Sequence, residues 1–320
     1  MLQKSTELQT LEDPGYKVVL DRLSICFSDK NQSNVSDTCA MLFGYANTQE
    51  IPTLKVTKNA RYNACAVFKV PFGEADAAKH PVCFEAGPTV PGAASYRLDF
   101  NPAKLTSKGI DELMAFLNSI VDAPPLEFFQ CGRVTRIDVA IDLHGITLEN
   151  LIVRTSRKQK HGVYSNRFGI PETVYLGTPK STRIVAYSKG ISGELLAGTR
   201  LECRLKPKCL GAEIANLPNP FGKIQLIPVA AVSKAGIGIP EPFLSDCIRV
   251  RGLRPVLKLL APQQRKTLES MLAKYPSMLP DMNDTWSSWP DVLIGCGLGK
   301  ELGATSLDHA KKYPASCKTP

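Results

Sequence analysis

The sequence has no long hydrophobic run. No apolar stretch reaches about 18 residues, the length that a membrane-spanning helix needs, and residues 1–5 lack the apolar core of a secretory signal. We therefore expect a cytoplasmic protein that does not use a membrane as a partner.

Closely spaced cysteines are also absent. The ten cysteines include no CxxC pair, and the closest two, Cys203 and Cys209, are six residues apart. Zinc fingers and ribbons need closer pairs than this, and disulfide frameworks are unusual in unexported chains of this length. The sequence thus predicts that the cysteines are small buried hydrophobic residues in a reducing environment.

Two motifs of DNA-processing enzymes are missing. Histidine occurs only at positions 80, 144, 161 and 309, so there is no His-hydrophobe-His pair of the kind that metal-dependent nicking enzymes carry. There is no Gly-Lys-Ser/Thr phosphate-binding loop either, which argues against a helicase activity in this chain.

The chain does have an excess of positive charge. Its 39 lysines and arginines against 30 acidic residues give a net charge of +9. A basic balance favours an anionic partner, and nucleic acid is the commonest one. With 320 residues, the chain is long enough for a catalytic domain and an accessory region.

The hydrophobic patterns predict an α+β fold with mostly antiparallel sheets, helices on one face and a helical C-terminal region. We expect strands at residues 18–27, 64–70, 95–100, 133–143, 173–176, 182–188 and 199–205. We expect helices at residues 107–121, 147–158 and within 243–279. The expected regions are an N-terminal lead-in (1–17), a catalytic domain (18–210), a proline-rich linker with one strand (211–242) and the helical region (243–320).

Two short runs are echoed later in the chain. Residues 97–99, Arg-Leu-Asp, resemble residues 200–202, Arg-Leu-Glu, and residues 22–27 resemble residues 136–141. These matches suggest the hypothesis of two related sheet units, of which the second keeps the carboxylates.

Three of the expected strands carry a polar face. Side chains two positions apart share one face of a strand, and these faces combine carboxylates, which suit a hard divalent ion, with arginines, which suit phosphate oxygens. The residues concerned are Arg136, Asp138 and Asp142, then Arg183, Tyr187 and Lys189, then Arg200, Glu202 and Arg204.

Strand geometry limits the metal prediction. Asp138 and Asp142 are four strand residues apart, about 13 Å at roughly 3.3 Å per residue. Unless the strand bulges, they cannot both bind one ion, so we expect one of them to pair with Glu202 from a neighbouring strand. The more central Asp138 is the first choice. The structural alternative is that all these faces are solvated and held by arginine–carboxylate pairs.

The ordered set of blocks at residues 135–142, 173–177, 183–189 and 200–202 resembles the replication initiation factor family. This family includes the rolling-circle initiators of small plasmids and filamentous phages. Residues 21–24 and 97–102 are similar to its phage branch. The resemblance covers about residues 18–210.

The resemblance implies a nucleophilic tyrosine in the block at residues 183–189, which falls on Tyr187. This tyrosine would attack a scissile phosphate in origin DNA, at a hairpin or a single-stranded nick site, leaving a 5′-phosphotyrosine. On physical grounds, Lys189 on the same strand face and a metal-held hydroxide or basic carboxylate would favour the phenolate. Arg183, Arg200 or Arg204 would hold the flanking phosphates. Tyr175 is the main rival nucleophile and Tyr164 a more distant one.

The resemblance also implies a metal and partners. Mg²⁺ or Mn²⁺ would be held by carboxylates from the set Asp138, Asp142 and Glu202. Expected partners are a host helicase and polymerase in a bacterial cytoplasm, together with a second copy of the chain. Position 188 is Ser, where many relatives have Asp or Asn, so the chain departs from the family pattern beside the expected nucleophile.

Further basic residues predict DNA contacts outside the catalytic face. Those expected to bind the DNA backbone are Arg154, Arg157, Lys158, Lys160, Arg200, Arg204, Arg249, Arg251 and Arg254. The C-terminal helices would supply duplex affinity and origin choice. The alternative function is a DNA-binding regulator without enzymatic activity, built on a degenerate initiator fold.

Overall fold

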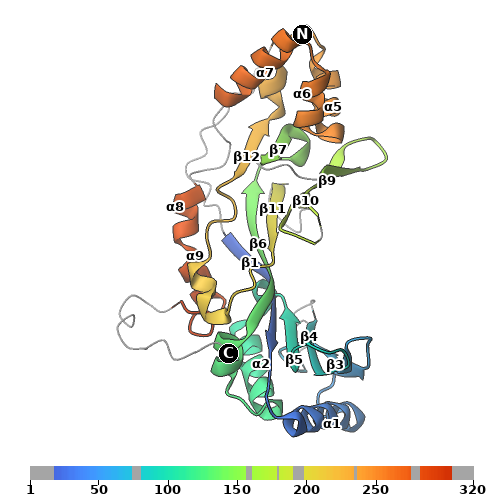
Figure 1. Cartoon of the computed structure of the whole chain (residues 1–320), viewed down its shortest axis with the longest axis vertical. Helices are drawn as coiled ribbons and strands as arrows, with labels where there is room; N and C mark the ends of the chain where they lie inside the picture. Colours follow the sequence, from blue (N-terminus) through green and yellow to red (C-terminus); the bar gives the residue numbers. More distant parts are fainter. Residues whose placement is uncertain are drawn as a thin grey trace.

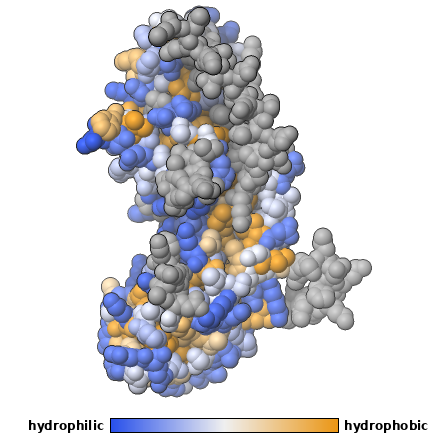
Figure 2. Space-filling model, turned by 180° about the vertical axis from the view of Figure 1, so that it is seen from behind, coloured by the Kyte–Doolittle hydropathy of each residue, from blue (hydrophilic) through white to orange (hydrophobic). Residues whose placement is uncertain are grey.

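The computed structural model describes residues 18–73, 81–155, 161–178, 180–189, 198–233, 236–274 and 282–304. The predicted lead-in, residues 1–17, lies outside them. The molecule is elongated, with α1 and α2 towards one end and α5, α6 and α7 at the other (Figure 1). On the face seen in Figure 2, hydrophilic and hydrophobic residues are interspersed.

The predicted α+β class is confirmed. A ten-stranded antiparallel sheet runs in the order β2-β3-β4-β5-β1-β6-β11-β10-β9-β8, and β7 with β12 forms a second small sheet. The strands are β1 (Val18–Phe27), β2 (Lys55–Thr57), β3 (Tyr62–Phe68), β4 (Val82–Pro88), β5 (Tyr96–Phe100), β6 (Arg133–His144), β7 (Leu151–Thr155), β8 (His161–Ser165), β9 (Pro171–Leu176), β10 (Arg183–Lys189), β11 (Gly198–Leu205) and β12 (Ile224–Pro228).

The large sheet contains the same topology twice. In the first unit β1 is followed across the sheet by β5, β4, β3 and β2; in the second, β6 is followed by β11, β10, β9 and β8. The units meet where β1 and β6 pair antiparallel. The topology therefore supports the hypothesis of two related sheet units.

The strand register corrects part of the sequence match. Asp99 lies opposite Ser24, and Glu202 lies opposite Ala140. If Asp99 and Glu202 are equivalent, Ser24 corresponds to Ala140, and Arg22 then corresponds to Asp138. Arg22 and Asp138 face each other directly in the β1–β6 pair, as an approximate twofold axis between the units requires. The match of residues 22–27 with 136–141 is therefore out of register by two residues.

Alternation separates the sheet into an apolar and a polar face. Apolar side chains such as Leu23, Leu98 and Ile137 are buried in the main core, against the helices that cover that face. These helices are α1 (Gln32–Thr48), α2 (Ser107–Ile120), α3 (Pro125–Cys131), α8 (Met282–Ser287) and α9 (Trp289–Gly295), with the short η1 (Pro102–Lys104) and η3 (Gly211–Asn216) beside them. The opposite face keeps the charged side chains.

A second hydrophobic core lies beyond the small sheet. Ile152 and Ile227 belong to this second core, while Val153 and Leu226 belong to the main core, so the β7–β12 sheet lies between the two. The helices around the second core are α4 (Val229–Ser233), α5 (Glu241–Arg251), α6 (Leu253–Leu259) and α7 (Pro262–Lys274). None of the helices in the described segments is long and apolar enough to cross a membrane.

The segment predicted as a linker (211–242) and the chain after α7 both pack against the main part of the molecule, although their composition predicts a linker and a separate helical region. The segment predicted as a linker contains its one strand, β12, and also η3 and α4, and its Phe221 is fully buried in the main core. After α7 the chain returns to the large sheet. There the indole nitrogens of Trp286 and Trp289 donate to main-chain oxygens, which gives both rings a packing role.

One predicted helix is wrong, and the helices α1, α3 and α4 were not predicted. Of the helix predicted at residues 147–158, the structure describes the residues up to 155. These form η2 (Leu148–Asn150) and then β7, because the run Leu151–Val153 is buried between two cores, where a strand with two apolar faces fits. Helix α1 was not predicted because only Val35, Thr38 and Leu42 of its 17 residues are buried. It begins at the N-cap Asn31, whose side chain accepts a hydrogen bond from the Ser33 amide.

Candidate active-site cleft

A cleft of about 470 Å³ opens on the polar face where the two units meet. Its charged walls come from strands of both units and combine arginines with carboxylates. The polar residues that line it include Asp21, Arg22, Arg97, Asp99, Arg136, Asp138, Tyr187, Glu202 and Arg204. Tyr187 is the only tyrosine among the described residues of this lining.

Tyr187 projects from β10 into this cleft. In the strand register it lies opposite Arg200 on β11 and Thr173 on β9. Burial raises the pKa of the Tyr187 phenol; the charge of Arg200 opposes this rise in pKa, while Glu202 and Asp21 add to it. The phenol is therefore uncharged at neutral pH, and Arg200 is the cation placed to favour the phenolate.

The rival tyrosines are placed differently. Arg183 stacks on the Tyr175 ring, with its Cζ 3.8 Å from the ring centroid, and Tyr164 meets that ring edge-on at 5.5 Å. Neither rival tyrosine lines the cleft, and Arg183 does not line it either. Arg183, predicted to hold a phosphate beside Tyr187, is instead packed on Tyr175. Its Nε is buried without a hydrogen-bond partner among the described residues.

Asp138 and Glu202 are brought together in the cleft. Their residues are only 2% and 3% exposed, and each carboxylate is held by an arginine on its own strand. Arg136 Nε donates to Asp138 Oδ1 at 2.9 Å, and Arg204 Nε donates to Glu202 Oε1 at 2.6 Å. Burial raises the pKa of Glu202, with Arg204 opposing and the nearby charge of Asp138 adding to the rise.

Asp142 lies outside the cleft. Arg200 binds it through two hydrogen bonds of 2.6 and 2.8 Å, and Lys189 Nζ donates to it at 2.6 Å. Burial alone would raise the Asp142 pKa, but these two cations outweigh it and hold the pKa at about 2. Lys189, predicted to act on Tyr187, is therefore an ion-pair partner of Asp142.

Of the three carboxylates from which the metal ligands were expected, the structure brings Asp138 and Glu202, but not Asp142, into one cleft. In the part of the chain that the structure describes, Asp138, Asp142 and Glu202 are not a group of donors within 4.8 Å of one another. Asp138 and Glu202 alone still fit Mg²⁺ or Mn²⁺, because Mg²⁺ usually takes one or two protein carboxylates and completes its shell with water and substrate phosphates. An ion bound there would compete with Arg136 for the Asp138 carboxylate and with Arg204 for the Glu202 carboxylate.

Of the predicted DNA-binding residues, three lie together in a second cavity. Arg154 on β7, Arg251 at the end of α5 and Arg254 on α6 line a cavity of about 260 Å³ between the small sheet and the C-terminal helices. Arg204 lines the cleft, whereas Arg200 is bound to Asp142 and Asp21. Arg157, Lys158, Lys160 and the Arg249 side chain lie outside the described residues.

The first unit contributes a charged network that was not predicted as part of the site. Arg97 donates to Glu85 at 2.7 Å and to Asp99 at 2.5 Å, and Arg22 donates to Asp99 at 2.8 Å. Glu85 lies opposite Arg97 just as Tyr187 lies opposite Arg200. The echo of residues 97–99 in 200–202 is the sequence signal that could have placed Arg97 and Asp99 at the site.

Comparison of the sequence with protein-family models and with curated proteins found no match.

Proposed function

We propose that this chain is a rolling-circle DNA replication initiator that nicks and rejoins one DNA strand through Tyr187. The observation that carries the proposal is the position of the Tyr187 phenol in a cleft that also presents arginines and buried carboxylates. Tyrosine nucleophiles need a neighbouring cation or base, because a phenol with an ordinary pKa near 10 is protonated at neutral pH.

The cleft residues can divide the chemistry among them. The Tyr187 oxygen attacks the scissile phosphorus, a 5′-phosphotyrosine bond forms, and the bond to the 3′ oxygen breaks, which leaves a free 3′-hydroxyl. The phenol proton passes to Asp21, whose charge acts on Tyr187, and from there to the departing 3′ oxygen, which leaves as the hydroxyl. Because one phosphodiester bond replaces another, closing the nick needs no ATP.

Three arginines would stabilise the phenolate and bind the phosphates of the DNA. Arg200 lies opposite Tyr187 and favours the phenolate. Arg136 and Arg204 border the cleft and suit phosphate oxygens, for which DNA would compete with their present carboxylate partners. Asp138 and Glu202 would hold Mg²⁺ or Mn²⁺, and such an ion, when bound, supplies charge stabilisation at a non-bridging phosphate oxygen.

A second DNA contact would come from the cavity lined by Arg154, Arg251 and Arg254. Phosphate neutralisation by such residues gives sequence-independent affinity that falls with salt. Recognition of origin DNA, cooperation with a host helicase and polymerase, pairing with a second copy and a bacterial cytoplasmic location remain expectations of the family resemblance.

The test is a nicking assay on supercoiled plasmid that carries the candidate origin, with Mg²⁺, Mn²⁺ or EDTA. We expect relaxed plasmid and a covalent DNA–protein band with metal, both lost in Tyr187→Phe. Tyr175→Phe is the matched control, because it removes a neighbouring hydroxyl outside the cleft. A covalent band that persists in Tyr187→Phe would refute the assignment.

One observation favours the alternative of a non-enzymatic DNA-binding regulator. Asp99, Asp138 and Glu202 in the cleft all have arginine partners, as expected if the charges only hold the sheet together. Salt-sensitive DNA binding without nicking under any metal would establish that alternative.

A further inference from the structure

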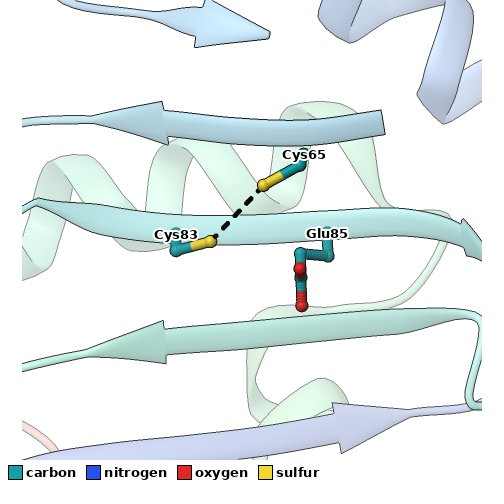
Figure 3. A group of neighbouring side chains, drawn as sticks. All are labelled: Cys65, Cys83 and Glu85. Carbon is teal, nitrogen blue, oxygen red and sulfur yellow. Dashed lines mark hydrogen bonds between the residues drawn. The ribbon is translucent and has the colours of Figure 1, made fainter. Parts of the chain in front are cut away.

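Two cysteines and a glutamate gather on the polar face of the first unit. Cys65 projects from β3, and Cys83 and Glu85 project from neighbouring positions on β4 (Figure 3). Their possible ligand atoms all lie within 4.8 Å of one another, and no other group of three or more His, Cys, Asp or Glu donors among the described residues does so. The two sulfur atoms are 3.8 Å apart.

This sulfur separation matches a shared tetrahedral metal. A Zn–S bond of about 2.3 Å with a tetrahedral S–Zn–S angle places two sulfur ligands about 3.8 Å from each other. A disulfide fits the strand positions less well. Cys65 lies opposite Glu85, and Cys83 lies opposite Val67, so the thiols form a diagonal pair. The Cα atoms of diagonal pairs are about 7–8 Å apart, beyond the usual disulfide range of about 4.4–6.8 Å.

The surroundings of Glu85 orient it for such a role. Asn59 Nδ2 donates to Oε1 at 2.7 Å, and Arg97 Nη1 donates to Oε2 at 2.7 Å. Outer partners of this kind fix the direction of a metal-binding carboxylate. Both cysteines are partly exposed, and Cys83 lines the cleft, which gives an ion a path to the thiols.

We propose that Cys65, Cys83 and Glu85 form a binding site for a thiophilic divalent ion, for which Zn²⁺ is the best match. Two sulfurs and one oxygen select such an ion over Mg²⁺ or Mn²⁺, which prefer oxygen ligands. With three protein ligands, the fourth position is open to water. The ion would link β3 to β4, and it would take up part of the Glu85 charge that now binds Arg97.

The site is independent of the nicking proposal. In the register of the repeated units, Glu85 occupies the place of Tyr187, and Cys83 occupies the place of Val185. The first unit therefore has soft ligands and a carboxylate where the second has its phenol. Cys65, Cys83 and Glu85 have no assigned part in the nicking chemistry. A failure to bind Zn²⁺ would therefore not refute the nicking proposal, and a failure to nick DNA would not refute the metal site.

The test titrates the full-length chain, reduced and freed of metals by a chelator, with Co²⁺ as a spectroscopic probe and then with Zn²⁺. We expect one equivalent of Co²⁺ to produce thiolate-to-cobalt charge-transfer absorption, which one equivalent of Zn²⁺ removes. Cys65→Ser and Cys83→Ser should each abolish the absorption and weaken Zn²⁺ binding at least about tenfold. Cys39→Ser on α1 is the control and should bind as the unchanged chain does.

A second measurement needs no substitution. Zn²⁺ should protect Cys65 and Cys83 from alkylation in the unchanged chain, as read by mass spectrometry of the peptides, and should leave Cys39 reactive. Absence of thiolate absorption, its persistence in both serine variants, or alkylation of Cys65 and Cys83 at the same rate with and without Zn²⁺ would each overturn the proposal.

Discussion

Replacing Asp142 by asparagine should destabilise the protein by a pH-dependent amount. Asp142 accepts two hydrogen bonds from Arg200 and one from Lys189, and its side chain is 13% exposed. Asparagine keeps the shape but removes the charge. Arg200, whose side chain is 11% exposed, would retain Asp21 as its remaining ion-pair partner.

The size of the effect follows from the Asp142 pKa. Burial would raise that pKa, but Arg200 and Lys189 lower it from 3.8 to about 2, and such a shift corresponds to about 2 kcal/mol of stability at neutral pH. Because the pKa is lower in the folded than in the unfolded protein, the stabilisation is complete above about pH 5 and is lost as the pH falls towards 2. About half of it should remain at pH 3.

Urea unfolding of both proteins at pH 7, 4 and 3 measures this difference. We expect Asp142→Asn to be less stable by about 2 kcal/mol at pH 7, with the gap shrinking to about 1 kcal/mol at pH 3. Asp111→Asn, at an exposed position on α2, is the control. A gap that stays constant from pH 7 to pH 3 would show that the loss comes from packing and would refute the ionic argument.

Two further predictions test the packing and the DNA contacts. Trp289→Ala should cost about 3–5 kcal/mol in urea unfolding, because the ring is fully buried and its indole nitrogen is hydrogen-bonded; a loss below 1 kcal/mol would contradict the packing role. Arg154→Gln with Arg251→Gln should lower the log–log salt slope of duplex binding by about 2 units, and an unchanged slope, as expected for the exposed control Lys223→Gln, would exclude this cavity as a DNA contact.

The strands of the sheet were predictable because one face is buried. The predicted limits of β1 are those observed, and β6, β10 and β11 differ from prediction by one residue at most at each end. In these strands, apolar and charged residues alternate because one face is buried and the other is not, so the alternation predicts the strand. Strand β4 was missed because it lies in a Gly- and Pro-rich stretch, and four consecutive residues, Phe84 to Gly87, are buried, so alternation is lost.

The candidate site was predictable only where the residues on one face of a strand identify it. Contacts that depend on how neighbouring strands pair could not be predicted. Asp138 could be preferred over Asp142 because it is the more central of the two on its strand, and the structure places Asp138 with Glu202 in one cleft. The role of Lys189 was not predictable, because a shared face does not tell which neighbouring strand supplies a closer charge. The cysteine prediction holds in part. Among the nine described cysteines Cys203 is buried, and five partly exposed ones pack against the two cores: Cys39, Cys131, Cys209, Cys247 and Cys296. The Cys65–Cys83 group was not predicted, because it depends on a pairing between β3 and β4 that sequence spacing does not reveal.

The repeated topology makes the differences between the units informative. Both units place an arginine next to a carboxylate on the strand beside the centre, Arg97 with Asp99 and Arg200 with Glu202. Only the second unit adds a phenol opposite its arginine, since Glu85 takes that place in the first. A carboxylate there repels a phosphate unless Arg97 or a bound cation neutralises it. Under the proposed function, one chain therefore offers one cleft nucleophile, and a second strand transfer must use Tyr187 again or the Tyr187 of another copy.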